Sequence, residues 1–230
     1  AVSVAGVFSA LRVTKQTLAE QRILFMGAGE AATGIADLFT AALVDEGMKP
    51  EEARKRSWLF DSKGLVVAGR GALAHHKQPY AHEHAPVADF LQAIEQLKPT
   101  AIIGVAATAG TFTEPVLRAM ARINARPIVF ALSNPTSKSE CTAAQAYAWS
   151  DGRALFACGS PFDPVTLDRH THVPRQGNNS YIFPGVGLGA IAVRAQRITD
   201  ATFLAAARAL AQQVTPEDLA QGSLYPPLPQ

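Results

Sequence analysis

The chain has 230 residues, of which 48 % are hydrophobic and 17 % charged, and its formal net charge is only +2. This composition indicates a globular protein and excludes both a disordered chain and the clustered basic surface of a nucleic-acid binder. The sequence has no apolar run near the ~20 residues that cross a bilayer, and its two cysteines, Cys141 and Cys158, give no disulfide framework. We therefore expect a soluble intracellular protein without nucleic-acid or membrane partners; the cytoplasm is favoured, and an organelle stays open.

The first part of the chain predicts two helices with a buried strand between them. Residues 1–13 place Val4, Val7, Phe8 and Leu11 on one helical face. Residues 23–26 are four consecutive apolar residues, which is typical of a strand covered on both faces of a parallel sheet. From residue 30 to 47 the apolar residues recur every three or four positions, which indicates an amphipathic helix.

A glycine-rich turn, RILFMGAGEAATG (22–34), joins this strand to this helix. Gly27 permits the turn, and Gly29 has no side chain to hold a pyrophosphate away from the backbone. Ala32 takes the third small position of the dinucleotide pattern, and Gly34 lets the helix press closely on the sheet. The N-terminus of the helix then offers free N–H groups to an anion. The turn predicts a dinucleotide site; the alternative is an ordinary tight turn between strand and helix.

Strands and helices alternate through the rest of the chain. We predict strands at 58–60, 101–105, 128–132 and 154–157, and helices at 87–97, from 114, at 143–147, 184–196, 200–213 and 215–221. Thr113, Thr142 and Thr215 are the expected caps of three of these helices, with Gln145 completing a capping box at the second. The alternation predicts one α/β domain over residues 1–230, with a Rossmann-like, doubly wound, mainly parallel sheet and helices on both faces.

Small and polar residues follow each predicted strand: GAG, Asp61-Ser62-Lys63-Gly64, AATAG, Ser133-Asn134-Pro135-Thr136 and Gly159-Ser160-Pro161. Ligands of open α/β sheets bind at these carboxyl ends, so the sequence predicts a dinucleotide crevice there.

The choice between NAD and NADP stays open on the residues alone. Asp61, at the end of the second strand, is the acid that usually holds the adenosine ribose and repels a 2′-phosphate, which favours NAD. Ser62, Lys63, Arg70 and Lys77 follow it and offer a hydroxyl and cations to such a phosphate, which favours NADP.

Several long motifs together resemble the cofactor-binding domain of malic enzymes: GAGEAATGIADL, WLFDSKGL, RPIVFALSNPTSKSECT, SPFDPV, QGNNSYIFPGVGLG and LYPPL. The resemblance covers essentially the whole chain. It implies oxidation and decarboxylation of (S)-malate to pyruvate and CO2, with NADP or NAD and with Mg²⁺ or Mn²⁺. The cofactor residues it implies are Gly27, Ala28, Gly29, Glu30, Ala31, Ala32, Gly34, Asp61, Ser62, Lys63, Lys77 and Asn134.

The same resemblance implies a part of the substrate site. Asn134 would lie near both nicotinamide and malate, and the pair Asn178–Asn179 would hold a malate carboxylate. Ser62 and Lys77 match the pattern of the NADP-preferring members. Arg175 stands where glycine is usual in the family, and this difference puts in question the detailed shape of the loop that carries Asn178.

Other functional parts of the family are expected upstream of Ala1, namely an acid–base tyrosine and lysine and a Glu–Asp–Asp metal set. We therefore expect this chain to be part of a longer protein, to bind cofactor without turning over malate alone, and to belong to a homodimer or homotetramer. We expect no metal ligands on this chain, because His75, His76, His82 and His84 are interpreted as a polar surface loop.

Two alternatives are weighed against an enzyme domain. A stand-alone module that senses cofactor redox state would have no use for the substrate amides of Asn134 and Asn178. Another dehydrogenase of this fold would need its own general base at a strand end. Cys158 is interpreted as a small buried hydrophobe, and Tyr181 and Phe183 as packing residues.

Overall fold

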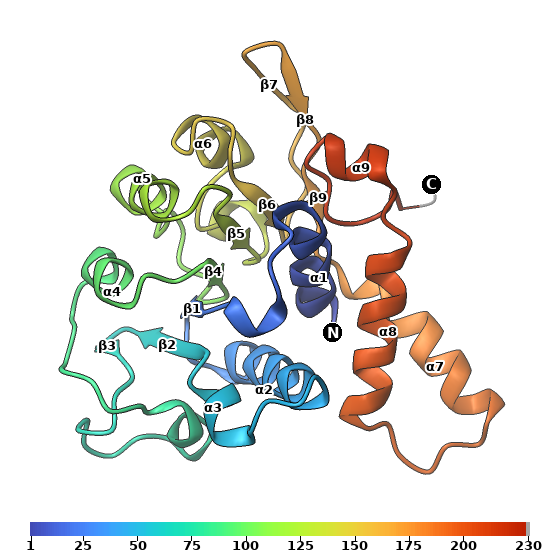
Figure 1. Ribbon diagram of the computed structural model, residues 1–230, viewed down its shortest axis with the longest axis horizontal. Helices are drawn as coiled ribbons and strands as arrows, with labels where there is room; N and C mark the ends of the chain where they lie inside the picture. The colour runs from blue at the N-terminus through green and yellow to red at the C-terminus, as the bar shows by residue number, and fades with distance from the viewer. Residues whose placement is uncertain (229–230) are drawn as a thin grey trace.

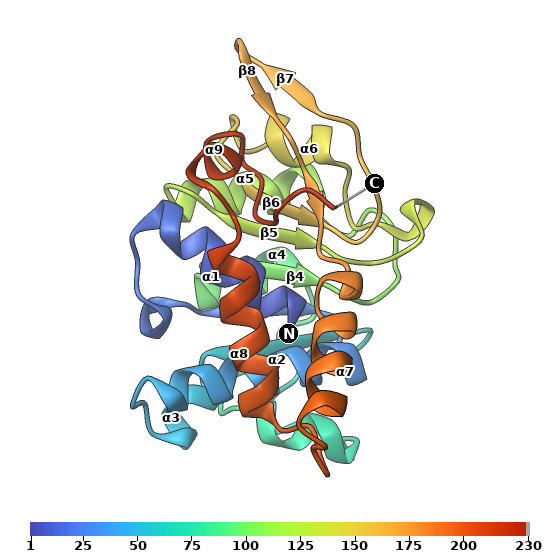
Figure 2. The ribbon, with the colours of Figure 1, turned by 90° about the vertical axis from the view of Figure 1, so that its right-hand side faces the viewer.

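The computed structural model describes residues 1–228, and its centre is a seven-stranded sheet with the strand order β3-β2-β1-β4-β5-β6-β9. Neighbouring strands are parallel except β3, which pairs antiparallel with β2. The strands of this sheet are β1 (Ile23–Met26), β2 (Ser57–Asp61), β3 (Gly64–Leu65), β4 (Ala101–Gly104), β5 (Ile128–Ala131), β6 (Leu155–Cys158) and β9 (Arg175–Gln176). A separate antiparallel hairpin, β7 (Val165–Leu167) with β8 (His170–His172), projects from the body of the molecule (Figures 1 and 2).

The strand order reverses between β1 and β4, which lie side by side although β2 and β3 come between them in the chain. Ile23 pairs with Ser57 of β2 on one side and with Ala101 of β4 on the other. Such a switch point opens a crevice at the carboxyl ends of the strands, where doubly wound sheets bind their ligands.

Helices cover both faces of the sheet. Figure 1 shows α4, α5 and α6 on one side, with α1, α2 and α8 on the other. The α-helices are α1 (Val2–Thr14), α2 (Glu30–Asp45), α3 (Pro50–Arg54), α4 (Phe90–Leu97), α5 (Glu114–Ile123), α6 (Ala143–Ala148), α7 (Phe183–Ala192), α8 (Asp200–Gln212) and α9 (Pro216–Ala220). Within residues 1–228, no helix has the length and apolar character that crossing a membrane requires.

The two faces of the sheet carry separate hydrophobic cores. In β1, Ile23 and Phe25 join the core beneath α1, α2 and α8, while Leu24 joins the core beneath α4, α5 and α6. Successive side chains of a strand point to opposite faces, so four consecutive apolar residues supply both cores. The predicted Rossmann-like α/β fold is confirmed.

Most predicted elements are confirmed within one or two residues, and the exceptions have identifiable causes. The predicted helix at 87–97 begins at Phe90 with Asp89 as its cap, because the Val87 carbonyl accepts a 2.8 Å hydrogen bond from Leu65 N–H beside β3. The predicted helix at 184–196 ends at Ala192, where Arg194 adopts a left-handed φ of 50°. The short elements α3, β3, β7, β8 and β9 are not predicted by the sequence pattern.

The expected caps differ in outcome. Thr142 and Thr215 both form complete capping boxes, as predicted at Thr142. Thr113 precedes α5 but makes no side-chain hydrogen bond to it. Tyr181 packs on Tyr225 with ring centroids 5.7 Å apart, whereas Phe183 is 76 % exposed, so the prediction that Phe183 is a packing residue is wrong for this chain.

The prediction that Gly34 lets α2 press on the sheet is also wrong. Gly34 is exposed, and a Cβ added there would meet no atom within 4 Å. The helical period places Ala32 and Ala36 on the buried face and Gly34 on the outer one. The close contact with the sheet is made by Ala32, which is fully buried.

Replacing Gly64 by alanine is expected to destabilise the fold by about 3 kcal/mol or more. Gly64 has φ +101°, and an added Cβ would lie 2.3 Å from the Val87 carbonyl oxygen. Gly47→Ala is the matched control, because Gly47 has φ +97° but open space around it, so it should lose only about 1–2 kcal/mol. Urea denaturation of both variants measures the difference, and equal losses would contradict the steric argument.

Candidate functional site

A cleft of about 760 Å³ opens at the carboxyl ends of β1, β2 and β4, at the switch point of the sheet. We name it the cofactor cleft. It brings together residues that are far apart in the sequence: Met26, Gly27, Ala28, Gly29, Phe60, Asp61, Ser62, Ala74, His76, Lys77, Ala88, Val105, Ala106, Thr108 and Thr111. Six residues predicted for the cofactor lie in its wall: Gly27, Ala28, Gly29, Asp61, Ser62 and Lys77.

The glycine turn forms the floor of the cleft. Gly27 has φ +124° and donates its N–H to the Phe60 carbonyl at 2.8 Å, which ties the end of β1 to β2. A Cβ on Gly27 would lie 3.1 Å from the backbone of Ala106, so glycine is also required by the close approach of the β4 loop.

Gly29 caps α2 and is surrounded by open space, since an added Cβ would meet no atom within 4 Å. Glu30 and Ala31 follow as exposed residues in the first turn, while Ala28 and Ala32 are buried beneath. An unobstructed helix N-terminus with free N–H groups suits the pyrophosphate of a dinucleotide.

Asp61 is held by two cations at the end of β2. Arg70 forms two parallel hydrogen bonds of 3.0 Å with its carboxylate, and Lys77 Nζ lies 2.7 Å from Oδ2. The Lys63 N–H donates to Oδ1 at 2.9 Å, while the Lys63 side chain is exposed. Two cations against one carboxylate leave this corner of the cleft positive, with the Ser62 hydroxyl beside it.

The charge of Asp61 is stabilised by these contacts. Burial raises the pKa of Asp61, but the hydrogen bonds from Arg70 and Lys77 outweigh it and hold the pKa at about 2. Because the pKa is lowered in the fold, the stabilisation is present above the ordinary value near 4 and is lost as the pH falls towards 2. The ion pairs are therefore intact at neutral pH.

The histidine-rich loop is anchored to the protein. His76 Nε2 lies 3.1 Å from the Ala28 carbonyl oxygen, and its Nδ1 lies 3.5 Å from the Glu30 carboxylate. His82 is half-buried against the edge of Trp58 and contacts the Ser57 carbonyl at 2.8 Å, so it is a packing residue within the predicted polar loop. Among residues 1–228, no three His, Cys, Asp or Glu side chains gather as metal ligands.

Asn134 and Asn178 lie beyond the cofactor cleft, after β5 and β9 at the same edge of the sheet. Asn134 Oδ1 accepts a 3.3 Å hydrogen bond from the buried hydroxyl of Ser160, and Asn178 Oδ1 accepts one of 2.9 Å from Ser180 N–H. Both amide oxygens are thus engaged, and neither Nδ2 donates to a group within residues 1–228. Each asparagine can therefore donate to a ligand oxygen. Asn179 is exposed beside Asn178.

Arg175 does not enter the loop that presents Asn178. It belongs to β9, and its guanidinium contacts Ser223 Oγ at 3.2 Å and Asp218 at 3.3 Å. Cys158, one position before Gly159, is fully buried, and burial raises its pKa to about 12, as predicted for an unreactive hydrophobe.

Glu140 is a structural residue of the site that sequence reasoning missed. Its fully buried carboxyl group accepts hydrogen bonds from the hydroxyl and the N–H of Ser133, and the Ser133 hydroxyl accepts one of 2.9 Å from Ala107 N–H. Burial raises the pKa of Glu140. These bonds join the β4 and β5 loops, and Gly104 makes room, since a Cβ there would lie 2.3 Å from the Glu140 carboxyl carbon.

The sheet, its switch point and the glycine turn are typical of a Rossmann-type dinucleotide-binding domain. The sequence model described as "Malic enzyme, NAD binding domain" matches residues 1–230. The chain belongs to this family.

Individual relatives agree with this assignment. The chain is 55 % identical over 228 residues to an NADP-dependent malic enzyme of Mus musculus, covering 99 % of this chain and 40 % of that protein. It is 53 % identical to a mitochondrial NADP-dependent malic enzyme of Homo sapiens, covering 99 % and 38 %. A solved NAD-dependent malic enzyme from Thermotoga maritima shares the fold, with a TM-score of 0.73, 23 % identity and coverage of 98 % and 52 %. The chain thus spans about two fifths of the length of the curated relatives it matches.

Proposed function

We propose that this chain supplies the cofactor site and part of the substrate site of an NADP-preferring malic enzyme, which converts (S)-malate to pyruvate and CO2. The observation that carries the cofactor preference is the pairing of Asp61 with both Arg70 and Lys77. An acid at this position opposes a 2′-phosphate only while its charge is uncompensated. Here two cations compensate it, and the names of the relatives at 53–55 % identity agree.

The residues would act by binding and orienting. The first turn of α2 would receive the pyrophosphate, and Ser62 with Lys77 would receive the 2′-phosphate of the adenosine ribose. When bound, the dinucleotide would supply the group that accepts the hydride from C2 of malate. Asn134 Nδ2 would donate to cofactor and substrate together, and Asn178 Nδ2, with Asn179 beside it, would donate to a malate carboxylate. Holding the reactants in a near-attack geometry can lower the barrier by several kcal/mol.

The residues that would bind the metal ion for the proposed reaction are not expected on this chain. Decarboxylation of oxaloacetate needs a cation that polarises its carbonyl oxygen, and residues 1–228 hold no metal-ligand set for Mg²⁺ or Mn²⁺. We assign the metal and the acid–base residues to the remainder of the enzyme, so this chain alone should bind cofactor without oxidising malate. We also propose a homodimer or homotetramer for the whole enzyme, and a cytoplasmic location, although two relatives are named as mitochondrial.

Calorimetric titration of the 230-residue chain with NADP, and separately with NAD, tests the proposal. We expect micromolar binding of NADP and at least tenfold weaker binding of NAD. Equal affinities, or tighter binding of NAD, would contradict the cofactor preference. The redox-sensing alternative gains no support from the fold or from the relatives, and it would leave the donor groups of Asn134 and Asn178 without a role.

A further inference from the structure

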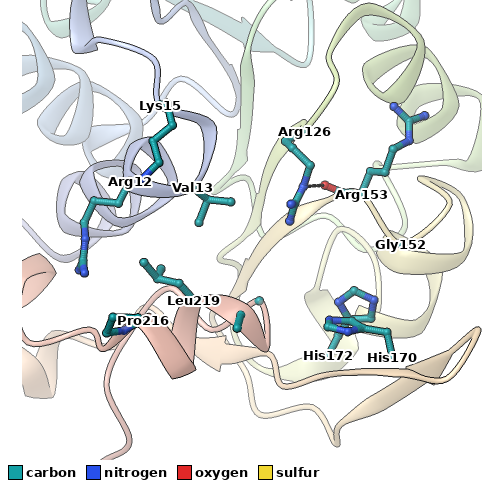
Figure 3. A pocket seen from close by; sticks show the side chains of 12 residues that line it. Arg12, Val13, Lys15, Arg126, Gly152, Arg153, His170, His172, Pro216 and Leu219 are labelled. Atoms are coloured by element: carbon teal, nitrogen blue, oxygen red, sulfur yellow. Dashed lines mark hydrogen bonds between the residues drawn. The ribbon is translucent and has the colours of Figure 1, made fainter.

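A second cavity, of about 490 Å³, lies at the amino ends of β5 and β6, on the edge of the sheet opposite the cofactor cleft (Figure 3). We name it the basic cavity. Its wall includes the basic residues Arg12, Lys15, Arg126, Arg153, His170 and His172. Among residues 1–228 no aspartate or glutamate lines it, although Asp151 Oδ2 lies 3.7 Å from Arg153 Nη2. Its other walls come from α9 and from two glycines, Gly152 and Gly222.

Two of these arginines already have structural partners. Arg12 donates to the carbonyls of Ala211 and Val214 at the end of α8, at 2.6 and 2.8 Å. Arg153 donates to the Ala121 carbonyl at 2.9 Å, at the end of α5. Both side chains point away from the histidines in Figure 3. They stabilise helix ends and are not ligand groups.

Arg126 and the two histidines face one another across the basic cavity (Figure 3). Arg126 Nε donates to the Arg153 carbonyl at 2.9 Å, which fixes the guanidinium, while its two terminal nitrogens have no hydrogen-bond partner within residues 1–228. His170 and His172 are 4.5 Å apart between ring centroids. The guanidinium therefore presents a free, preoriented fork of donors to the cavity.

The two ring nitrogens of His172 both face the glycine walls. A Cβ on Gly152 would lie 3.4 Å from Nε2, and one on Gly222 would lie 3.5 Å from Nδ1. Behind this wall His172 stacks on Tyr147, with ring centroids 4.2 Å apart. The missing side chains at Gly152 and Gly222 leave both ring nitrogens of His172 next to the cavity.

We propose that the basic cavity binds a small oxyanion, a phosphate or a carboxylate group, held by the fork of Arg126 and by the imidazoles of His170 and His172. Guanidinium groups bind both anions in a bidentate manner. The anion would compensate the positive charge that the wall leaves unbalanced. Burial is the main cause that lowers the pKa of His172, and the neighbouring His170 and Arg126 act in the same direction.

The basic cavity and the cofactor cleft lie at opposite edges of one sheet and share no wall residue. The oxyanion would therefore bind without displacing the dinucleotide, and the proposal does not depend on the cofactor preference. The walls of the basic cavity come in part from α1, α9 and the β7–β8 hairpin, so the site lies where three peripheral segments meet the sheet.

NMR titration of the histidine ring signals of the 230-residue chain tests the proposal, with inorganic phosphate in one arm and succinate in the other. The signals of His170 and His172 should shift and saturate with at least one anion, and the arm that saturates at lower concentration names the ligand class. Lys77→Gln is used as the background, so that phosphate in the cofactor cleft does not contribute.

Two variants and a control complete the experiment. Arg126→Gln should weaken binding at least tenfold, and His170→Asn, at an exposed position, should weaken it without affecting folding. Arg118→Gln is the matched control, because Arg118 is a half-exposed helix residue whose one ion-pair partner within residues 1–228 is Glu114, and the variant should bind as the parent does. Absence of saturable shifts at His170 and His172, or parental affinity in both Arg126→Gln and His170→Asn, would overturn the proposal.

Discussion

Asn134→Ala in the complete enzyme should lower kcat about a hundredfold while leaving the fold nearly unchanged. The Asn134 side chain is exposed, and its one contact within the described part of the chain is the 3.3 Å bond from Ser160. Little stability therefore depends on it. Its Nδ2 is the donor that we expect to hold cofactor and malate in register, so its loss should affect the reacting geometry. Steady-state kinetics with malate and NADP, together with thermal denaturation, measure both effects.

Ser137→Ala is the control for this loop. Ser137 is exposed in the same segment and makes no hydrogen bond described for residues 1–228, so its removal should leave kcat within about twofold of the parent. A near-normal kcat in Asn134→Ala would refute the orienting role. An equal fall of kcat in Ser137→Ala would show that any substitution in this loop lowers activity, and that the effect is not specific to Asn134.

Lys77→Gln should weaken NADP binding by roughly ten- to a hundredfold more than NAD binding, since a charge-assisted hydrogen bond contributes about 1.5–3 kcal/mol. The substitution removes the cation expected to contact the 2′-phosphate. It also leaves Asp61 with Arg70 alone, which reduces the positive charge at this corner of the cleft. Both consequences act against NADP and neither acts strongly on NAD. Calorimetric titration with the two cofactors measures the ratio.

Lys63→Gln is the matched control for Lys77. Lys63 follows Asp61 closely in the chain, but its side chain is exposed and only its backbone N–H contacts the carboxylate. The control should therefore change the two affinities by similar small factors. If Lys77→Gln weakens the affinities for NAD and NADP equally, Lys77 does not contribute to the cofactor preference.

The fold was largely predictable because its signals are local. The uninterrupted apolar strand at 23–26 and the three- to four-residue rhythm from Ile35 to Leu43 reflect burial patterns that a parallel sheet with covering helices imposes. The misplaced start of α4 had a non-local cause. Val87 is buried because it lies beside β3, and no periodicity within 87–97 could reveal that contact.

The candidate site was predictable at its strand ends and hidden in its supporting contacts. Gly27, Gly29 and Asp61 were located because turns and strand ends have recognisable residues. Glu140 was missed because its function depends on Ser133 and on the space left by Gly104, which come from other elements. The basic cavity was missed for the same reason, since Arg126 and His172 lie 46 positions apart in the chain.

The alternation of strands and helices, the glycine turn and the membership of the malic enzyme family follow from the sequence alone, because local periodicity and contiguous motifs encode them. The distribution of charge depends on the tertiary structure. Whether Asp61 repels a phosphate depends on Arg70 and Lys77 closing on it from 9 and 16 positions away. Electrostatic interactions act over distances in space, and only the folded chain sets those distances.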